Sequence, residues 1–413
     1  MGLRDEYDAS TASALPFSAH QASRLCSRSR QRRYGRQSVL QSTQLAQIVH
    51  TFHATAQQGG ILSMCTQIGY AIGLFIFVPL GDMKERRRLI LILLIVVALF
   101  LVGIATAQNM AWMDAASLAV GVTSIAPQLL IPLAAQLAAP HERGKVISSV
   151  MSGLLIGILL ARTASGWIGG DFGWRTMYWI AALMMVILSV LLRLLLPQTF
   201  PEQTVTYREL FVSVGRLIRE QPTLRETSLL GATLFGGFSL FWTTLTFFIE
   251  QAPYHYGSQI AGLFGLVGVV GAVAARFAGR LADRMPAQIL SGFALTTVLL
   301  SFLCFWIFGY HLVGLILGIV LLDLGTQAGH ILNQSRIFNL LPEARNRLNM
   351  VYMVAYFLGG SISSAIGSFV WTAWRWNGVC AFGCVLVATG FSVWGTYRVK
   401  SLNAASANDE SST

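Results

Sequence analysis

The stretch Pro79-Leu80-Gly81-Asp82-Met83-Lys84-Glu85-Arg86-Arg87-Arg88 is a short charged segment between two long apolar runs. A related segment, Gly279-Arg280-Leu281-Ala282-Asp283-Arg284, places Asp283 at 201 residues after Asp82. Two further pairs keep almost the same spacing: Pro140 and Arg143 recur as Pro342 and Arg345, and Trp174-Arg175 recurs as Trp374-Arg375. Three landmarks that return in the same order indicate one structural unit used twice.

The composition is that of a membrane protein. Of 413 residues, 54% are hydrophobic and 11% are charged, and the mean hydropathy is +0.60, which is too apolar for a soluble domain of this length. Apolar runs near the ~20 residues that cross a bilayer follow one another from Gly60 almost to Lys400. They must be helices, because open strands would leave backbone groups unsatisfied in lipid. We predict eleven spans, at 60–81, 88–108, 112–138, 146–169, 175–196, 226–250, 258–279, 287–309, 312–337, 347–371 and 376–397.

The net charge of +11 follows the expected topology. Beyond residue 40, 19 of 22 lysines and arginines lie in alternate loops or in the C-terminal tail. The positive-inside rule then predicts that these loops and the C-terminus are cytoplasmic, in a cell inner membrane. This pattern accounts for the charge, so we expect no nucleic-acid partner. The five cysteines are scattered and predict no disulfide framework, and His50 and His53 have no third ligand, so we expect no metal and no cofactor.

Charged side chains inside the predicted spans are the candidates for function, since each costs about 2.5 to 3.5 kcal/mol at the bilayer centre. Arg162 lies in span 146–169, and Asp323 lies near the middle of span 312–337. Asp323, Gln327, His330 and Gln334 follow i, i+4, i+7, i+11 spacing and so form one polar stripe on an apolar helix.

Two interpretations of this stripe stay open. Asp323 and His330 change charge with their surroundings, which suits proton or substrate binding. The alternative is a buried hydrogen-bond network that holds helices together. We expect the stripe to face a cavity. Gln128 lies beside Pro127, which can break span 112–138, and it either faces the same cavity or has a structural role. The candidate substrate or proton pathway is therefore Arg162, Asp323, Gln327, His330, Asn333, Gln334 and Gln128.

Several motifs carry a family resemblance. Residues 78–87 resemble the pattern G-x-L-A-D-R-x-G-R-[RK] between the second and third helices of the major facilitator superfamily, with departures at Val78, Met83 and Glu85. The segment 140–145 is similar to the family's loop between helices four and five, and 173–175 to the loop between five and six. The resemblance covers residues 44–400. Within the family it is nearest to drug:proton antiporters and arabinose-type efflux permeases, through the stretches 322–325, 333–334 and 347–349 and Tyr352.

The resemblance implies an all-α membrane protein with two parallel six-helix repeats, of which the first helix is missing here, and a transporter that works by alternating access. It implies a proton-coupled efflux of a small organic solute, drug- or sugar-like, and we expect a monomer. It also implies a cytoplasmic gate, made of Asp82, Arg86, Arg87, Arg143, Asp283 and Arg284.

Two departures make antiport less firmly implied than transport. Ser117 stands where the branch has an arginine, and Ala161-Arg162 stands where it has Gly-Pro. A transport-inactive membrane protein that lacks the first helix is one alternative. A membrane-embedded enzyme is another, but it requires a cluster of His, Asp or Cys, and of seven histidines only His330 lies within a span.

The predicted organisation is a polar Arg-rich segment 1–43, expected to be disordered, an N-terminal helical bundle 44–196, a linker 197–225, a C-terminal bundle 226–398 and a cytoplasmic tail 399–413. We expect 44–59 to be a polar outer connection and the linker to contain a surface-lying amphipathic helix. This topology places seven arginines of residues 1–40 outside, against the positive-inside rule. We therefore expect another frame or upstream start to supply the missing helix, and the alternative is a genuine eleven-helix transporter.

Overall fold

The computed structural model describes residues 44–137, 167–197, 207–255, 287–341 and 344–412, with a few isolated positions between them. All regular structure in these residues is helical, as the sequence predicts. The helices are α2 (Gln44–Thr51), α3 (Ala56–Met83), α4 (Arg86–Ala105), α5 (Met110–Thr123), α6 (Ala126–Leu137), α8 (Trp174–Leu195), α9 (Tyr207–Glu220), α10 (Pro222–Ile249), α12 (Ala287–Phe308), α13 (Leu312–Phe338) and α14 (Arg345–Ser412).

Eight helical segments of the described chain are long and apolar enough to cross a membrane. One of them, Arg345–Val399, holds two of the predicted spans, because the backbone of α14 breaks at Arg375, with φ 53° and ψ −149°. Nine of the eleven predicted spans are thus matched within this part of the chain. The other two, 146–169 and 258–279, fall largely outside it.

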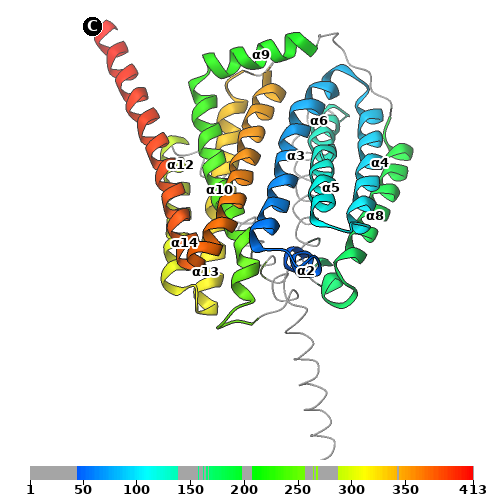
Figure 1. Ribbon diagram of the computed structural model, residues 1–413. Coiled ribbons are helices and arrows are strands. Elements are labelled where there is room, and N and C mark those ends of the chain that lie inside the picture. The colour runs from blue at the N-terminus through cyan, green and yellow to red at the C-terminus, as the bar shows by residue number, and fades with distance from the viewer. Residues whose placement is uncertain are drawn as a thin grey trace, which may run out of the picture. The chain divides into compact units, whose positions relative to one another are not determined.

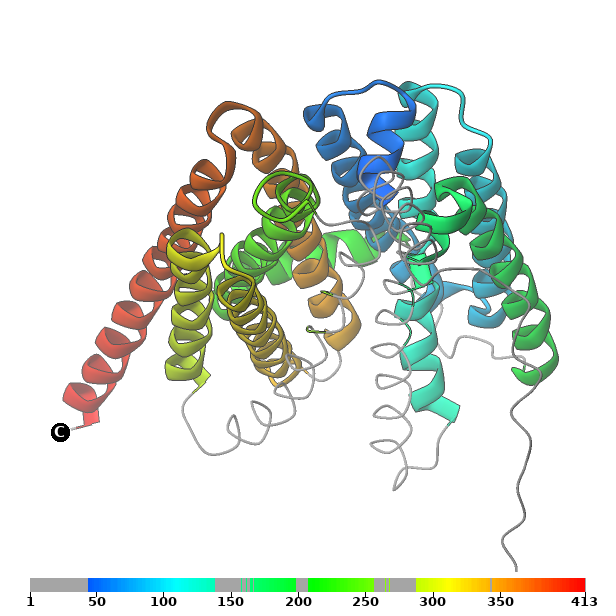
Figure 2. The ribbon, with the colours of Figure 1, turned by 90° about the horizontal axis from the view of Figure 1, so that it is seen from below.

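The helices pack in two groups (Figure 1). In the first group, α3 packs on α5 and α4 packs on α5 and α8; in the second, α10 packs on α13 and α14, and α12 packs on the same two helices. The groups meet where α3 runs along the first half of α14, and Figure 2 shows the same arrangement from below. The apolar core of the second group is aromatic, with Phe248 stacked on the fully buried Trp376 at 3.8 Å between ring centroids.

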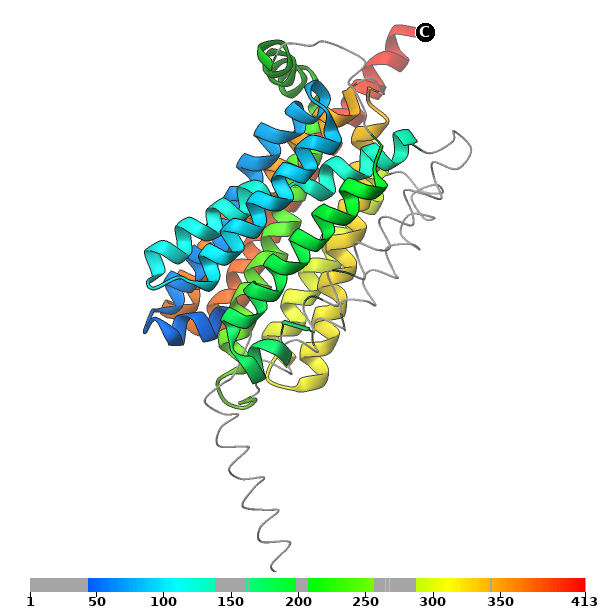
Figure 3. The ribbon, with the colours of Figure 1, turned by 90° about the vertical axis from the view of Figure 1, so that its right-hand side faces the viewer.

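Helix α9 lies across one end of the other helices (Figures 1 and 3). Its buried face carries Leu210, Val214 and Leu217, while its arginines are exposed, so the predicted amphipathic helix in the linker is confirmed. It contacts both groups: the Tyr207 hydroxyl donates to the carbonyl of Ile76 on α3 at 3.1 Å, and Arg347 of α14 donates to Ser213 at 2.8 Å. We call this end, which also holds the turn from α3 to α4, the basic end, and the end that holds α2 the opposite end.

The start of the first span differs from the prediction. The predicted outer connection 44–59 contains a short helix, α2, whose Ile48 is buried and whose Gln47 donates to the carbonyl of Gly169 at 2.8 Å. Helix α3 begins at Ala56 instead of 60, because Thr55 and Gln58 form a reciprocal capping box.

The predicted span 112–138 is two helices. A turn at Ser124–Ile125 separates α5 from α6, although Met110–Leu130 together is long and apolar enough to cross a membrane. Pro127 lies in the first turn of α6, where its missing N–H has no helical partner to lose. The helix is therefore broken near Pro127, as the sequence predicts, with the break two residues before the proline.

Candidate functional site

The polar stripe of α13 is turned into the second group of helices. Asp323 is only 4% exposed and Asn333 only 1% exposed, and Gln327, His330 and Gln334 are partly buried. The helix forms here because its residues are overwhelmingly apolar, and it packs on α10, α12 and α14 along the faces that carry Leu322 and Leu332. The stripe therefore does not face lipid, as its spacing predicted.

Two tyrosines of α14 meet the stripe. The hydroxyl of Tyr352 lies 2.9 Å from Nδ1 of His330, within hydrogen-bond distance. One turn further along, the Tyr356 ring lies 4.8 Å from the His330 ring, and Tyr356 is close enough to Asp323 to interact with its charge. Both tyrosines are buried. Asp323 and His330 are thus joined through α14, although seven residues separate them on α13.

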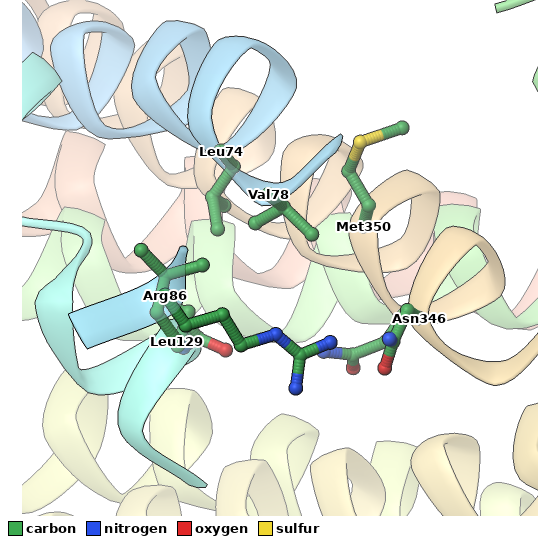
Figure 4. Close-up of a pocket in the computed structure, with 8 residues that line it drawn as sticks. Leu74, Val78, Arg86, Leu129, Asn346 and Met350 are labelled. Atoms are coloured by element: carbon green, nitrogen blue, oxygen red, sulfur yellow. The ribbon is translucent and has the colours of Figure 1, made fainter. Parts of the chain in front are cut away.

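The stripe ends at a cavity near the basic end. Gln334 donates to Asn349 of α14 at 3.2 Å, and Asn349 lines a cavity of about 30 Å³ between α3, α4, α6 and α14. Figure 4 shows the Arg86 guanidinium of α4 pointing toward Asn346 of α14 across this cavity. Gln128 lines this cavity and donates to the Tyr70 hydroxyl at 3.4 Å, whereas Asp323, which we expected at the same cavity, is not among the lining residues.

An aromatic cluster lies where the two groups meet. Tyr70 of α3 packs on Phe357 of α14 at 4.3 Å between ring centroids, and Phe235 of α10 stacks on Tyr356 at 4.1 Å. Phe235 also meets Phe357 edge-on at 5.2 Å. This cluster could not be predicted from the sequence, because its members come from three helices and share no spacing along the chain.

A polar seam follows toward the opposite end. Gln67 of α3 donates to Ser364 of α14 at 3.2 Å and accepts from Ser239 of α10 at 3.4 Å. Near the start of α3, Gly60 approaches α14 so closely that a Cβ there would lie 1.9 Å from the Ser368 oxygen. At Gly60 the backbone of α3 therefore lies directly against the Ser368 side chain of α14.

The structure describes part of the predicted gate. The Nε of Arg86 donates to the Gly81 carbonyl at 2.9 Å, and Arg87 donates to the carbonyl of Arg193 at the end of α8. The two arginines thus connect the start of α4 to the ends of α3 and α8 at the basic end. The remaining predicted residues lie outside the described part of the chain, or their side chains do: Asp82, Arg143, Arg162, Asp283 and Arg284.

Two acidic residues were missed by the sequence analysis. Glu226 of α10 is 3% exposed and forms a bidentate ion pair with Arg336 of α13, at 3.0 and 2.6 Å. Asp114 of α5 has a buried carboxylate oxygen with no hydrogen-bond partner among the described residues. Both residues lie near the start of a predicted span. An acidic residue at that position was the only feature of the sequence that could have identified them as buried. Among the residues that the structure describes, no three His, Cys, Asp or Glu side chains gather as metal ligands.

Known proteins resemble this chain in sequence and in fold. The family model of the Major Facilitator Superfamily matches residues 35–364. "Uncharacterized transporter YgaY" of Escherichia coli O157:H7 is 40% identical over 358 residues, which is 86% of this chain and 91% of the relative. "Probable transporter SCO4007" of Streptomyces coelicolor is 30% identical over 346 residues, 84% of this chain and 80% of the relative.

Solved structures of similar fold are transporters too. A bacterial homologue of the human lysosomal transporter Spinster superposes with a TM-score of 0.68 at 14% identity, covering 89% of this chain and 93% of that one. The nucleoside transporter NupG gives a TM-score of 0.67 at 13% identity, covering 85% and 93%. Members of this family are transporters, so the enzyme alternative is excluded. The chain belongs to the Major Facilitator Superfamily and is a multi-pass membrane transporter of small molecules.

Proposed function

We propose that this transporter exports a small organic solute, drug- or sugar-like, in exchange for protons, by alternating access at a site between the two groups of helices. The observation that carries the proposal is the buried carboxylate of Asp323, on a polar stripe that leads to the cavity at the basic end. The protein acts as a monomer in a cell inner membrane, with the basic end and the C-terminus in the cytoplasm.

Proton coupling is supported by the surroundings of Asp323. A charged carboxylate in the middle of a membrane helix is costly to bury. Binding a proton removes the charge and therefore removes most of this cost. Asp323 interacts with Tyr356, which packs on His330. Asp323 and His330 therefore both lie next to Tyr356. A proton bound by either residue changes the electrostatic potential at this tyrosine.

Binding of an organic solute is supported by the aromatic cluster. Tyr70, Phe235, Tyr356 and Phe357 offer ring faces and edges at the meeting of α3, α10 and α14. Such rings bind flat apolar bodies, and the neighbouring amide of Gln67 and hydroxyl of Ser364 offer hydrogen bonds to polar groups. Because α3 belongs to one group and α10 and α14 to the other, a solute bound here is released when the groups separate.

The gate belongs to the same proposal. Arg86 and Arg87, together with Asp82, Arg143, Asp283 and Arg284, hold the two groups closed at the basic end in one state and release them in the other. Arg86 faces Asn346 of α14 across the cavity, which places a charged group of one helix group against the other (Figure 4).

Asp323→Asn tests the proposal, because it keeps the volume of the side chain and removes its charge. In proteoliposomes loaded with a pH-sensitive dye, we expect ethidium, tetraphenylphosphonium or arabinose to drive proton movement with the wild-type chain and not with the variant. Glu220→Gln, an exposed carboxylate of α9, is the matched control and should leave the flux unchanged. Unaltered flux and pH dependence in Asp323→Asn would demote Asp323 to a structural role. Absence of flux of every probe with the wild-type chain favours the transport-inactive alternative.

A further inference from the structure

Tyr352 stands between two polar groups of α13. Its hydroxyl lies 2.9 Å from Nδ1 of His330, and its other neighbour is the side chain of Asn333. Asn333 is buried, yet neither its amide nitrogen nor its amide oxygen has a hydrogen-bond partner with good geometry in the described part of the chain. A buried amide without a hydrogen bond is costly in free energy. Its place beside the Tyr352 hydroxyl suggests a second arrangement in which the amide makes a hydrogen bond to that hydroxyl.

The position of the Tyr352 ring is fixed by α10. A Cβ at Gly231 would lie 2.6 Å from Cε2 of the ring and 3.0 Å from its hydroxyl oxygen, so the ring fills the place of a side chain at 231. Tyr352 is fully buried, and the ring has no room to swing away. Only the hydroxyl hydrogen is free to turn about the C–O bond.

The state of His330 decides which way that hydrogen points. A neutral imidazole whose Nδ1 is bare accepts the hydrogen bond from the Tyr352 hydroxyl. An imidazolium carries hydrogen on both nitrogens, so its Nδ1–H must donate to the tyrosine oxygen. The hydroxyl hydrogen then needs another acceptor, and the amide of Asn333, the other polar neighbour of Tyr352, supplies one when its oxygen is turned toward the hydroxyl.

We propose that Tyr352 is a positioning residue for proton binding at His330, and that its hydroxyl hydrogen passes from His330 to Asn333 when the imidazole gains a proton. This inference rests on the proposed role of the α13 stripe in proton coupling. No proton is lost or created by the turn itself: the incoming proton binds Nδ1, and the tyrosine keeps its own hydrogen.

Among the residues that the structure describes, the other charged and titratable groups around His330 do not replace this partner. Tyr356 meets His330 through its ring, and Asp323 stands seven residues away on the same helix. On α10, Glu226 is bound in its ion pair with Arg336. Helix α12, which packs on α13, contains no charged residue between 287 and 308.

Tyr352→Phe tests the proposal, because it keeps the ring against Gly231 and removes only the hydroxyl. A hydrogen bond from a charged donor is worth more than one from a neutral donor, so loss of the hydroxyl disfavours the imidazolium on balance. We expect the pH at which half of His330 is protonated to fall by about one unit. It is read from the ¹⁵N chemical shifts of histidine-labelled protein in nanodiscs, with the His330 signals assigned by their loss in His330→Gln.

Three further variants sharpen the result. Asn333→Leu removes the second acceptor and should shift His330 in the same direction. Gly231→Ala keeps every hydrogen-bonding group but displaces the Tyr352 ring, and it should shift His330 as well. Tyr254→Phe removes another buried tyrosine hydroxyl, which donates to the Gly309 carbonyl at 2.7 Å, and should leave His330 unchanged.

The outcomes separate this inference from the proposed function. An unchanged His330 titration in Tyr352→Phe, or a His330 that stays neutral from pH 4 to pH 9, overturns the role of Tyr352 even if transport is proton-coupled. A shifted His330 in a protein that moves no protons supports the positioning role and overturns proton coupling. If Tyr352→Phe fails to fold, the Asn333→Leu and Gly231→Ala titrations decide.

Discussion

At the scale of the residue, α13 carries two largely buried ionisable side chains, Asp323 and Arg336, in different surroundings. Asp323 lies in the middle of the helix near Tyr356, whereas Arg336 lies in its last turn and is bound by Glu226. Spacing along α13 predicted the stripe, because side chains three and four residues apart share a face of any helix. It did not predict the ion pair, because Glu226 is 110 residues away in sequence.

The ion pair gives the first prediction. Glu226→Gln should lower the thermal unfolding temperature markedly, because Arg336 would keep its charge at 11% exposure without a carboxylate. Breaking a buried pair from one side costs about 3 to 5 kcal/mol. Tryptophan fluorescence of the purified protein during heating measures the change, and Glu220→Gln on the exposed face of α9 is the control. A Glu226→Gln protein as stable as the control would mean that the pair contributes little to stability.

At the scale of the element, the apolar runs predicted the spans but not always their ends. The length and composition of an apolar run show which residues can cross the bilayer. The residue at which a helix begins or ends is decided by local hydrogen bonds instead. The capping box at Thr55 and Gln58 begins α3 four residues before the predicted start. Helix α2 is short and carries buried polar and apolar residues alike, so it gives no membrane signal.

The seam between α3 and α14 gives a second prediction. In Gly60→Val the first side-chain atom would lie 1.9 Å from the Ser368 oxygen, so the helices must separate at the opposite end. Overpacking of about 1 to 3 kcal/mol shifts the balance between closed and open forms by roughly tenfold. We expect a cysteine placed at Ser364 in a chain without its native cysteines to react about ten times faster with a maleimide.

Gly395→Val is the matched control for that measurement. A Cβ at Gly395 meets no other atom within 4 Å, so the same substitution creates no strain there. Equal labelling rates in the two variants would show that the seam accommodates the larger side chain without separation of α3 from α14.

At the scale of the whole molecule, the proposed alternating access requires the two groups of helices to move against each other. The groups are joined by α9 at the basic end and by the seam along α3 and α14. Ser361 of α14 donates to the carbonyl of Met64 on α3 at 3.4 Å, which marks a point where the groups touch.

A reversible cross-link at that point gives the last prediction. With cysteines at Met64 and Ser361 in a chain freed of its native cysteines, oxidation should abolish flux in proteoliposomes, and a reductant should restore it. The control pair is Thr233 and Gly390, which join α10 to α14 inside the second group with 3.6 Å between Cβ positions, a separation that suits a disulfide. Full flux with the first pair oxidised would contradict rocking about the seam.

The sequence alone determined the membrane setting, the helical class, nine of the described spans and the polar stripe of α13. These follow from periodicity and run length, which are properties of a chain read in order. Only the tertiary structure decided that Tyr352 bonds His330, that Glu226 holds Arg336 and that Tyr70, Phe235 and Phe357 meet. Such partners come from different helices, and the close approach that Gly231 allows depends on how those helices pack and not on their order in the chain.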